Sequence, residues 1–174
     1  TPKSYFSSSS QVLRNGIKLK YCDISLNTHN LDPVLLTDRI NKNTKAVIFV
    51  HLGGNPEGIV EVSNICKKNG IYLIEDCSQA HGAKINNKFA GSFGNISIWS
   101  FCNDKIISTG GEGGMIATNN KSFFLKLWYE RDTGKNYHKF YKKYKNNGYK
   151  YMHDYIGTNA RMTETQAIIG IEQL

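Results

Sequence analysis

Short apolar runs alternate with amphipathic stretches along most of the chain. Apolar runs at 45–51, 71–76 and 96–101 predict strands. The first of these is continuously apolar, as a parallel sheet covered on both faces requires. Amphipathic stretches at 31–41 and 56–69 predict helices between the strands. This β-α-β order predicts an α/β fold with a doubly wound sheet and right-handed crossovers.

Local stop and start signals define the remaining elements. The predicted helices are 5–15, which ends at an Asn-Gly pair, 121–131 and 163–174; the further predicted strands are 18–24 and 115–118. Asp32 or Asn30 is expected to cap the helix at 31–41, with Pro33 in its first turn. Thr163 and Gln166 have the spacing of a capping box. The long connection 132–158 has little pattern, and such connections are usually functional or mobile.

Composition sets the class of protein without identifying it. The chain has 174 residues, 40% of them hydrophobic, which is enough for a single-domain core. The net charge is +8, and its densest part is the segment 135–150, where lysines and aromatic residues interleave. This segment is compatible with nucleic-acid binding or with anionic substrate phosphates. A solvated, lysine-rich loop is the interpretation that we favour, and we expect no nucleic-acid partner.

The cysteines give no sign of a metal site or a disulfide framework. Cys22, Cys66, Cys77 and Cys102 show no CxxC spacing. Reduced thiols in a cytoplasmic protein fit this pattern best. No apolar run approaches the roughly 20 residues of a membrane-spanning helix, so no membrane insertion is expected.

Lys105 is the first candidate for chemistry. It follows the predicted strand 96–101 after a short polar turn and precedes four glycines, Gly110, Gly111, Gly113 and Gly114. Burial near a strand end disfavours the ammonium form of a lysine, and a neutral amine is what a Schiff base with an aldehyde requires. Glycines allow backbone to approach a ligand closely. An ordinary solvated loop lysine is the alternative.

Asp76 is the second candidate, because it ends the predicted strand 71–76. In open α/β sheets, ligands bind beyond the carboxyl ends of the strands. An aspartate there can pair with a pyridinium nitrogen and keep the ring an electron sink. The alternative is a helix N-cap, a common use of Asp after a strand.

Two motifs in combination, EDCSQAHGA at 75–83 and SFCNDKIISTGGEGG at 100–114, resemble one family of enzymes. They are similar to the sugar aminotransferases of the DegT/DnrJ/EryC1/StrS group. The resemblance extends over nearly the whole chain, from TPKSYFSSSSQVLRNG to GTNARMTETQAIIGIEQL. It implies the three-layer α/β/α large domain of a fold-type I pyridoxal-phosphate (PLP) transferase, with a mostly parallel sheet.

The resemblance also implies roles for individual residues. Lys105 aligns with the lysine that binds PLP as a Schiff base and then acts as general base and acid, and Asp76 aligns with the partner of the pyridine nitrogen. The other cofactor contacts that it implies are Gln79 near the ring oxygen, Ser100 on the phosphate, Tyr5 stacked on the ring, and Asn159, near Arg161, on the phosphate of a neighbouring subunit. His81 is expected to support the site by hydrogen bonding, without a catalytic role. Each of these has an ordinary structural alternative as a loop, strand-end or turn residue.

The sequence departs from the family pattern in two respects. Many relatives have His-Pro between the Ser-Phe pair and the lysine, whereas Cys102, Asn103 and Asp104 stand here. This puts in doubt a histidine role beside the lysine, and with it the substrate subclass. The glycine-threonine start of the phosphate cup and the small C-terminal domain are absent from residues 1–174. We therefore expect this chain to be the cofactor-binding part of a longer protein.

The leading functional hypothesis is an aminotransferase that moves an amino group, with glutamate as the expected donor, to a nucleotide-linked keto-deoxysugar. Its products would serve the biosynthesis of surface polysaccharides such as lipopolysaccharide, and the enzyme would be a homodimer with shared active sites. A PLP-dependent dehydratase or epimerase is one alternative, although a related dehydratase subgroup has histidine in place of Lys105. A non-catalytic regulatory protein with the same fold is another. A cysteine hydrolase using Cys77 or Cys102 with His81 is the least supported.

Overall fold

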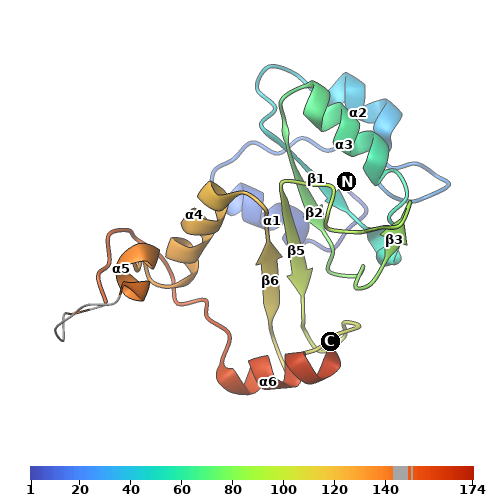
Figure 1. Cartoon of the computed structure of the whole chain (residues 1–174). Helices are drawn as coiled ribbons and strands as arrows, with labels where there is room; N and C mark the ends of the chain where they lie inside the picture. Colours follow the sequence, from blue (N-terminus) through green and yellow to red (C-terminus); the bar gives the residue numbers. More distant parts are fainter. Residues whose placement is uncertain (143–148, 150) are drawn as a thin grey trace.

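The computed structural model describes residues 1–142, 149 and 151–174 (Figure 1). Its helices and strands follow the predicted alternation. In chain order they are α1 (Ser7–Arg14), α2 (Pro33–Arg39), β1 (Ala46–Val50), the 3₁₀ turn η1 (Leu52–Gly54), α3 (Ile59–Lys68), β2 (Tyr72–Asp76), β3 (Lys84–Ile85), β4 (Lys88–Phe89), β5 (Ile96–Ser100), β6 (Gly114–Ala117), α4 (Lys121–Arg131), α5 (Tyr137–Tyr141) and α6 (Glu164–Gln173).

The main sheet has the strand order β1-β2-β5-β6. β1, β2 and β5 are parallel, and β6 runs antiparallel to β5. In register, Val50 lies opposite Asp76, and Asp76 lies opposite Ile98. The carboxyl ends of the parallel strands therefore meet at one edge. This confirms the expected α/β fold with a mostly parallel sheet.

Helices cover both faces of the sheet. Successive residues of a strand point to opposite faces, so each face presents its own side chains to the helices that pack on it. On one face, Val47, Phe49 and Leu73 pack in a core with Ile59 and Val62 of α3. On the other face, the ring of Tyr72 contacts Phe123 of α4, with centroids 5.3 Å apart, and Asp76 contacts Ser8 of α1. The sheet thus lies between α2 and α3 on one side and α1 and α4 on the other (Figure 1).

Capping chemistry sets the starts of two helices as expected. The Asp32 side chain accepts hydrogen bonds from the backbone N–H groups of Val34 and Leu35, with Pro33 in the first turn of α2. Thr163 and Gln166 form the predicted capping box at the start of α6.

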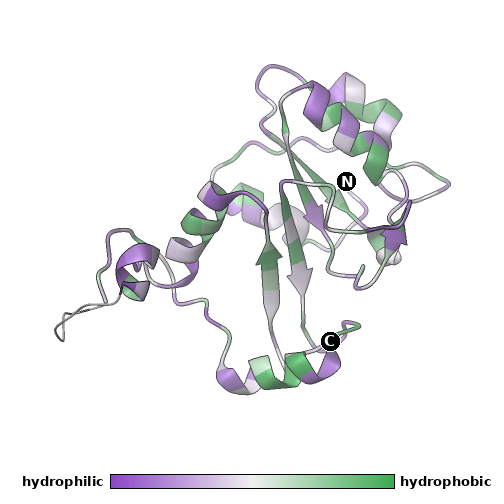
Figure 2. Cartoon of the chain, in the orientation of Figure 1, coloured by the Kyte–Doolittle hydropathy of each residue, from purple (hydrophilic) through white to green (hydrophobic). Residues whose placement is uncertain are grey.

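Figure 2 shows that β6 and the middle of α6 are hydrophobic. Met115 and Ile116 of β6 and Ile168 of α6 are exposed.

Three segments differ from the sequence prediction. Residues 18–24 do not form a strand: Ile24 makes a single bridge to Leu31, and no described strand lies beside this segment to complete a ladder. The loop-rich region 79–95 contains the short hairpin of β3 and β4. The connection 132–158 contains α5, whereas its residues 143–148 and 150 lie outside the described part. Among the described helices, none is both long and apolar enough to cross a membrane.

Candidate cofactor site

The candidate residues meet at the edge where the parallel strands end. Asp76 is the last residue of β2 and Ser100 the last of β5. Lys105 follows in the turn after β5, where its backbone N–H donates to the Cys102 carbonyl at 3.0 Å. The chain then returns to Gly114, which pairs with Ser100 at the start of β6. The topology thus brings Asp76, Ser100 and Lys105 to one end of the sheet, where α/β proteins bind ligands.

Asp76 is buried, with 6% of its surface exposed, and donors hold both of its carboxylate oxygens. Oδ1 accepts from the Ser78 backbone N–H at 3.2 Å and from the Ser78 hydroxyl at 2.6 Å. Oδ2 accepts from the Ser8 hydroxyl at 2.8 Å. The helix N-cap alternative is wrong, because the chain after Asp76 forms turns up to β3.

Glu75, the neighbour of Asp76, points to the opposite face and has a structural role. Its fully buried carboxylate accepts from His51 Nε2 at 3.0 Å and from the N–H groups of Gly91, Phe93 and Gly94 at 2.5–2.7 Å. Burial opposes its ionisation. The hydrogen bonds from His51 and from the Gly91 and Gly94 N–H groups outweigh burial, so that the pKa of Glu75 lies below its ordinary value.

Replacing Glu75 with glutamine is expected to destabilise the fold by about 1–3 kcal/mol, because an amide NH₂ would face buried N–H donors. Since the folded pKa of Glu75 is depressed, its contribution is present above 4.5 and is lost as the pH falls below that value. Thermal unfolding between about pH 5 and 3 should show a steeper loss in the wild type than in Glu75→Gln. Glu57→Gln, at an exposed position, is the control. Equal slopes in all three proteins would contradict this role.

Lys105 is partly buried, with 19% of its side chain exposed, as predicted for a lysine just past a strand. Its Nζ lies 3.5 Å from Asp104 Oδ1. The Cys102 thiol donates to the same oxygen at 2.8 Å, and this bond, followed by the charge of Lys105, lowers the pKa of Asp104. Because Asp104 is exposed, the ion pair holds Lys105 only weakly.

Two features explain the glycines after Lys105: a positive φ at one position and close packing of the loop at two others. Gly110 has a φ of 72°, a left-handed conformation that favours glycine. A side chain at Gly113 would clash with Thr109 Oγ1, and one at Gly114 would lie 2.8 Å from the Trp99 carbonyl. At Gly113 and Gly114 the space is therefore taken by the protein itself. The need for glycine at these two positions is therefore explained by packing, and close approach of a ligand stays a prediction.

Helix α6 fixes the same loop, a feature that sequence analysis missed. The Gln173 amide donates to the Ser108 carbonyl at 2.7 Å and accepts from the Ser108 N–H at 2.9 Å. Gln166 donates to the Glu112 carbonyl at 2.6 Å. Gln166 and Gln173 lie two turns apart on the same side of the helix. Such a spacing is too common in sequences to have indicated these contacts.

Three further predicted residues lie around this edge. Tyr5 is 80% exposed and lies one turn before Ser8, whose N–H donates to its carbonyl at 3.1 Å. Gln79 accepts from the Gly53 N–H at 2.7 Å. The His81 ring packs against Trp99 and Phe101, with centroids 5.3 and 5.8 Å away, and its pKa is lowered by burial and by Lys105.

The expected hydrogen-bonding role of His81 is weak: neither ring nitrogen has a well-formed hydrogen bond among the described residues, although the Ser100 backbone lies close enough to raise its pKa slightly against burial. Packing of the His81 ring against Trp99 and Phe101 is its main contact.

The lack of a hydrogen bond from a thiol to His81 among the described residues opposes the cysteine hydrolase hypothesis, which needs such a bond. Cys77 is fully buried, and burial raises the pKa of its thiol far above the ordinary value. Cys77 therefore lacks the thiolate that a nucleophile requires.

His51, Glu75 and Cys77 lie close enough together to be considered as metal ligands. The Glu75 carboxylate, however, is already saturated by four hydrogen bonds. The cluster is therefore accounted for as part of the core. All four cysteines are free thiols, and burial raises the pKa of Cys66 to about 11.

Asn159 lies beside the end of α4, next to Asp132. It forms a bridge with Asp132, and its Oδ1 accepts from Arg161 Nε at 3.1 Å. Arg161 Nε also lies 3.2 Å from Asp132 Oδ1.

In the lysine-rich segment 135–150, Lys135 is buried, with its Nζ 3.0 Å from Asp132 Oδ1, so the expectation of a solvated loop is wrong at this residue. Lys139 pairs with Asp154, which leaves less unpaired positive charge for a nucleic acid.

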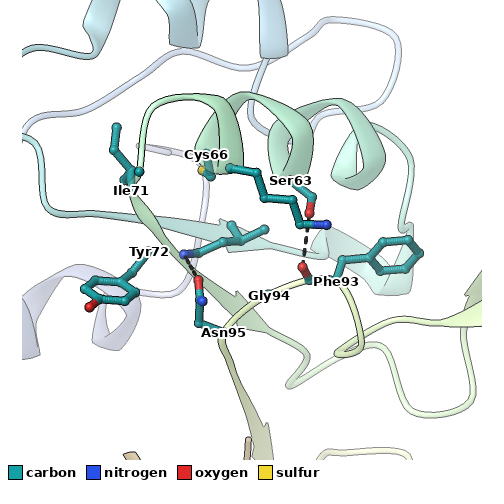
Figure 3. Close-up of a pocket in the computed structure, with 10 residues that line it drawn as sticks. Ser63, Cys66, Ile71, Tyr72, Phe93, Gly94 and Asn95 are labelled. Carbon is teal, nitrogen blue, oxygen red and sulfur yellow. Dashed lines mark hydrogen bonds between the residues drawn. The ribbon is translucent and has the colours of Figure 1, made fainter. Parts of the chain in front are cut away.

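A pocket of about 340 Å³ lies at the opposite end of the sheet (Figure 3). Ile71 and Tyr72 at the start of β2, and Asn95 just before β5, line it. Inside it, Ser63 donates to the Phe93 carbonyl at 3.0 Å, and Asn95 accepts from the Leu73 N–H at 2.8 Å. None of the predicted site residues lines this pocket, so it is not the candidate site.

Comparison with known proteins accounts for the convergence of these residues. The sequence profile of the DegT/DnrJ/EryC1/StrS aminotransferase family matches residues 1–174. The chain belongs to this family. GDP-perosamine synthase of Escherichia coli O157:H7 is 33% identical over 171 residues, which are 98% of this chain and 44% of that protein.

Two solved structures support the family fold. The aminotransferase from Psychrobacter cryohalolentis superposes with a TM-score of 0.94 at 40% identity, over 99% of this chain and 44% of that one. PseC of Helicobacter pylori, an aminotransferase involved in pseudoaminic acid biosynthesis, gives 0.87 at 30% identity, over the same shares. This member of the family thus spans less than half the length of the proteins that it matches.

The described residues fit the PLP that the family implies. A carboxylate can accept about four hydrogen bonds. Asp76 Oδ1 already accepts two and Oδ2 one, which leaves one acceptor position on Oδ2 for a ring N–H. Lys105 offers a partly buried amine, and Ser100 a hydroxyl whose oxygen accepts only a long bond of 3.4 Å from the Cys102 N–H.

Proposed function

We propose that the protein containing this chain is a PLP-dependent aminotransferase that converts a nucleotide-linked keto-deoxysugar to an amino sugar. The observation that carries the proposal is the meeting of Lys105 and the buried Asp76 at one edge of the sheet. The relatives support the substrate class, since their names refer to a GDP-linked amino sugar and to an aminotransferase of sugar biosynthesis. Glutamate as donor and surface polysaccharide as destination are part of the proposal.

The chain's own residues divide the work. Lys105 supplies the amine that attaches the cofactor and afterwards moves a proton to and from the substrate carbon. Asp76 accepts a hydrogen bond from the ring nitrogen and keeps that nitrogen protonated. When bound, the protonated pyridine ring withdraws electrons from the reacting carbon. Burial of Asp76 strengthens this electrostatic effect.

Four more residues are proposed to bind the cofactor. Ser100 donates its hydroxyl to the phosphate, Gln79 lies near the ring oxygen, and exposed Tyr5 stacks on the ring. Asn159 reaches the phosphate of a second subunit in a homodimer. The exposure of Asn159 supports this last role, because a second subunit can reach its side chain.

We further propose that residues 1–174 form part of the large, cofactor-binding domain and that a small C-terminal domain belongs to the full-length protein. The 44% share of the relatives that the chain spans supports this division. Four free thiols support a cytoplasmic location.

The alternative chemistries are less well supported. A dehydratase of the histidine-containing subgroup conflicts with Lys105. A regulatory protein that keeps only the fold does not need a buried carboxylate with one open acceptor position, because such a group costs free energy to bury.

The test is an absorbance titration of the full-length protein with PLP and then with glutamate. We expect a visible band on PLP binding that disappears when glutamate is added, as the amino group passes to the cofactor. A nucleotide-linked keto-sugar should restore the band and yield an amino sugar by mass spectrometry. A band that is insensitive to amino donors would contradict the aminotransferase, and loss of water from the sugar would identify the dehydratase.

A further inference from the structure

Helix α1 begins with four consecutive serines, Ser7 to Ser10, and the structure gives them different partners. The Ser8 hydroxyl leaves its own helix and donates to Asp76 Oδ2, 68 residues away, at 2.8 Å. The Ser9 hydroxyl stays within its own turn and donates to the Phe6 carbonyl at 3.1 Å. Neighbouring serines on one helix thus have separate functions.

The contact completes a hold on the carboxylate from two sides. Ser78 binds Oδ1 through both its N–H and its hydroxyl, and Ser8 binds Oδ2. With a donor on each oxygen, the carboxylate plane cannot rotate without breaking a bond. Hydrogen bonds to a charged acceptor are shorter and stronger than those between neutral groups. Because Asp76 is buried, water does not replace a lost donor freely.

Ser8 itself is held in place. Its Oγ lies 3.0 Å from the hydroxyl oxygen of Ser4, and its N–H donates to the Tyr5 carbonyl. The chain Ser4–Ser8–Asp76 therefore connects the first turn of α1 to the end of β2. Tyr5, the proposed stacking residue, lies just before this helix.

We propose that Ser8 is a positioning residue for Asp76: its hydroxyl holds Oδ2 so that the remaining acceptor position of this oxygen faces the cofactor's ring nitrogen. This inference rests on the proposed function. It assigns Ser8 an effect on the protonation of that nitrogen, beyond an effect on the packing of α1.

The experiment measures the ¹⁵N chemical shift of the ring nitrogen of ¹⁵N-labelled PLP bound to the full-length protein, as a function of pH. Ser8→Ala is compared with Ser9→Ala, which removes a hydroxyl from the same helix. Loss of positioning predicts that the pH at which the ring nitrogen loses its proton falls by about one unit in Ser8→Ala, because the displaced Oδ2 no longer meets the ring N–H. A rise would show that Ser8 only draws negative charge from the carboxylate, and would overturn the inference. Ser9→Ala should match the wild type.

Ser8→Thr keeps the hydroxyl and should restore the wild-type titration. This variant also covers the case in which Ser8→Ala folds poorly, which thermal unfolding of the cofactor-free protein will show. Equal titrations in Ser8→Ala and Ser9→Ala, with only a lowered Tm in the former, would overturn the inference and leave Ser8 a purely structural residue.

A failure of the proposed function gives a different result. In that case Asp76→Asn leaves the ring-nitrogen signal unchanged, which overturns the role of Asp76 and that of Ser8 together. If Asp76→Asn changes the signal and Ser8→Ala does not, the proposed function stands and the inference on Ser8 falls.

Discussion

Replacing Lys105 with alanine is expected to abolish covalent attachment of the cofactor and to reduce turnover by at least about 10⁴-fold. The reason is that one amine supplies both the nucleophile and the general acid and base, and loss of the proton-transfer group alone costs about 10²–10⁴-fold. Borohydride reduction of the PLP-loaded protein followed by peptide mapping should label the peptide of Lys105 in the wild type and no peptide in the variant.

The matched control is Lys88→Ala, which removes an exposed lysine from β4. It should keep both label and turnover. A small primary amine added to Lys105→Ala should restore part of the activity, because the missing group is then supplied from solution. Label at another lysine in the wild type would refute the assignment of Lys105.

Replacing Asp76 with asparagine is expected to leave the cofactor bound but to lower turnover by about 10²–10³-fold, the cost of removing one preorganised electrostatic partner. The asparagine amide can still occupy the site between Ser8 and Ser78, so the local hydrogen bonds survive in part. The amide carries no negative charge, and the ring nitrogen therefore loses the group that keeps it protonated. Steady-state kinetics and PLP titration of the same preparation will separate the two effects.

Asp38→Asn, at an exposed position of α2, controls for the loss of a negative charge elsewhere and should be neutral. Near-normal turnover in Asp76→Asn would show that Asp76 serves only the turn with Ser78. Loss of folding in place of loss of turnover would assign it to stability, together with its neighbour Glu75.

Much of the architecture followed from local patterns in the sequence. The apolar runs that became β1, β2 and β5 are one-dimensional signals, and the run of β1 is apolar throughout, as a strand buried on both faces requires. The Asp32 cap and the capping box of Thr163 and Gln166 depend on residues at most three positions apart. The prediction at 18–24 was wrong, because alternation alone does not supply a neighbouring strand.

The two motifs around Asp76 and Lys105 were also sufficient to indicate the family, which the comparisons confirmed for all 174 residues. The roles of the individual residues stay predictions. Sequence alone offered Glu75 and Asp76 as adjacent carboxylates, and both the end of the predicted strand and the resemblance pointed to the second. The fold separates them physically: the pleat of β2 turns Glu75 toward His51 and three backbone N–H groups, and turns Asp76 toward α1.

Only the tertiary structure determined the contacts between residues far apart in the chain. Ser8 reaches Asp76 across 68 positions, and Gln173 reaches the loop of Lys105 across 65. Four serines in a row and a glutamine near a helix end carry no local signal for such partners. Side-chain hydrogen bonds depend on the position of whole elements in three dimensions. The sequence by itself therefore determined the strands, the caps and the family, whereas the packing of α1 and α6 against the sheet edge decided which side chains hold Asp76 and the Lys105 loop in place.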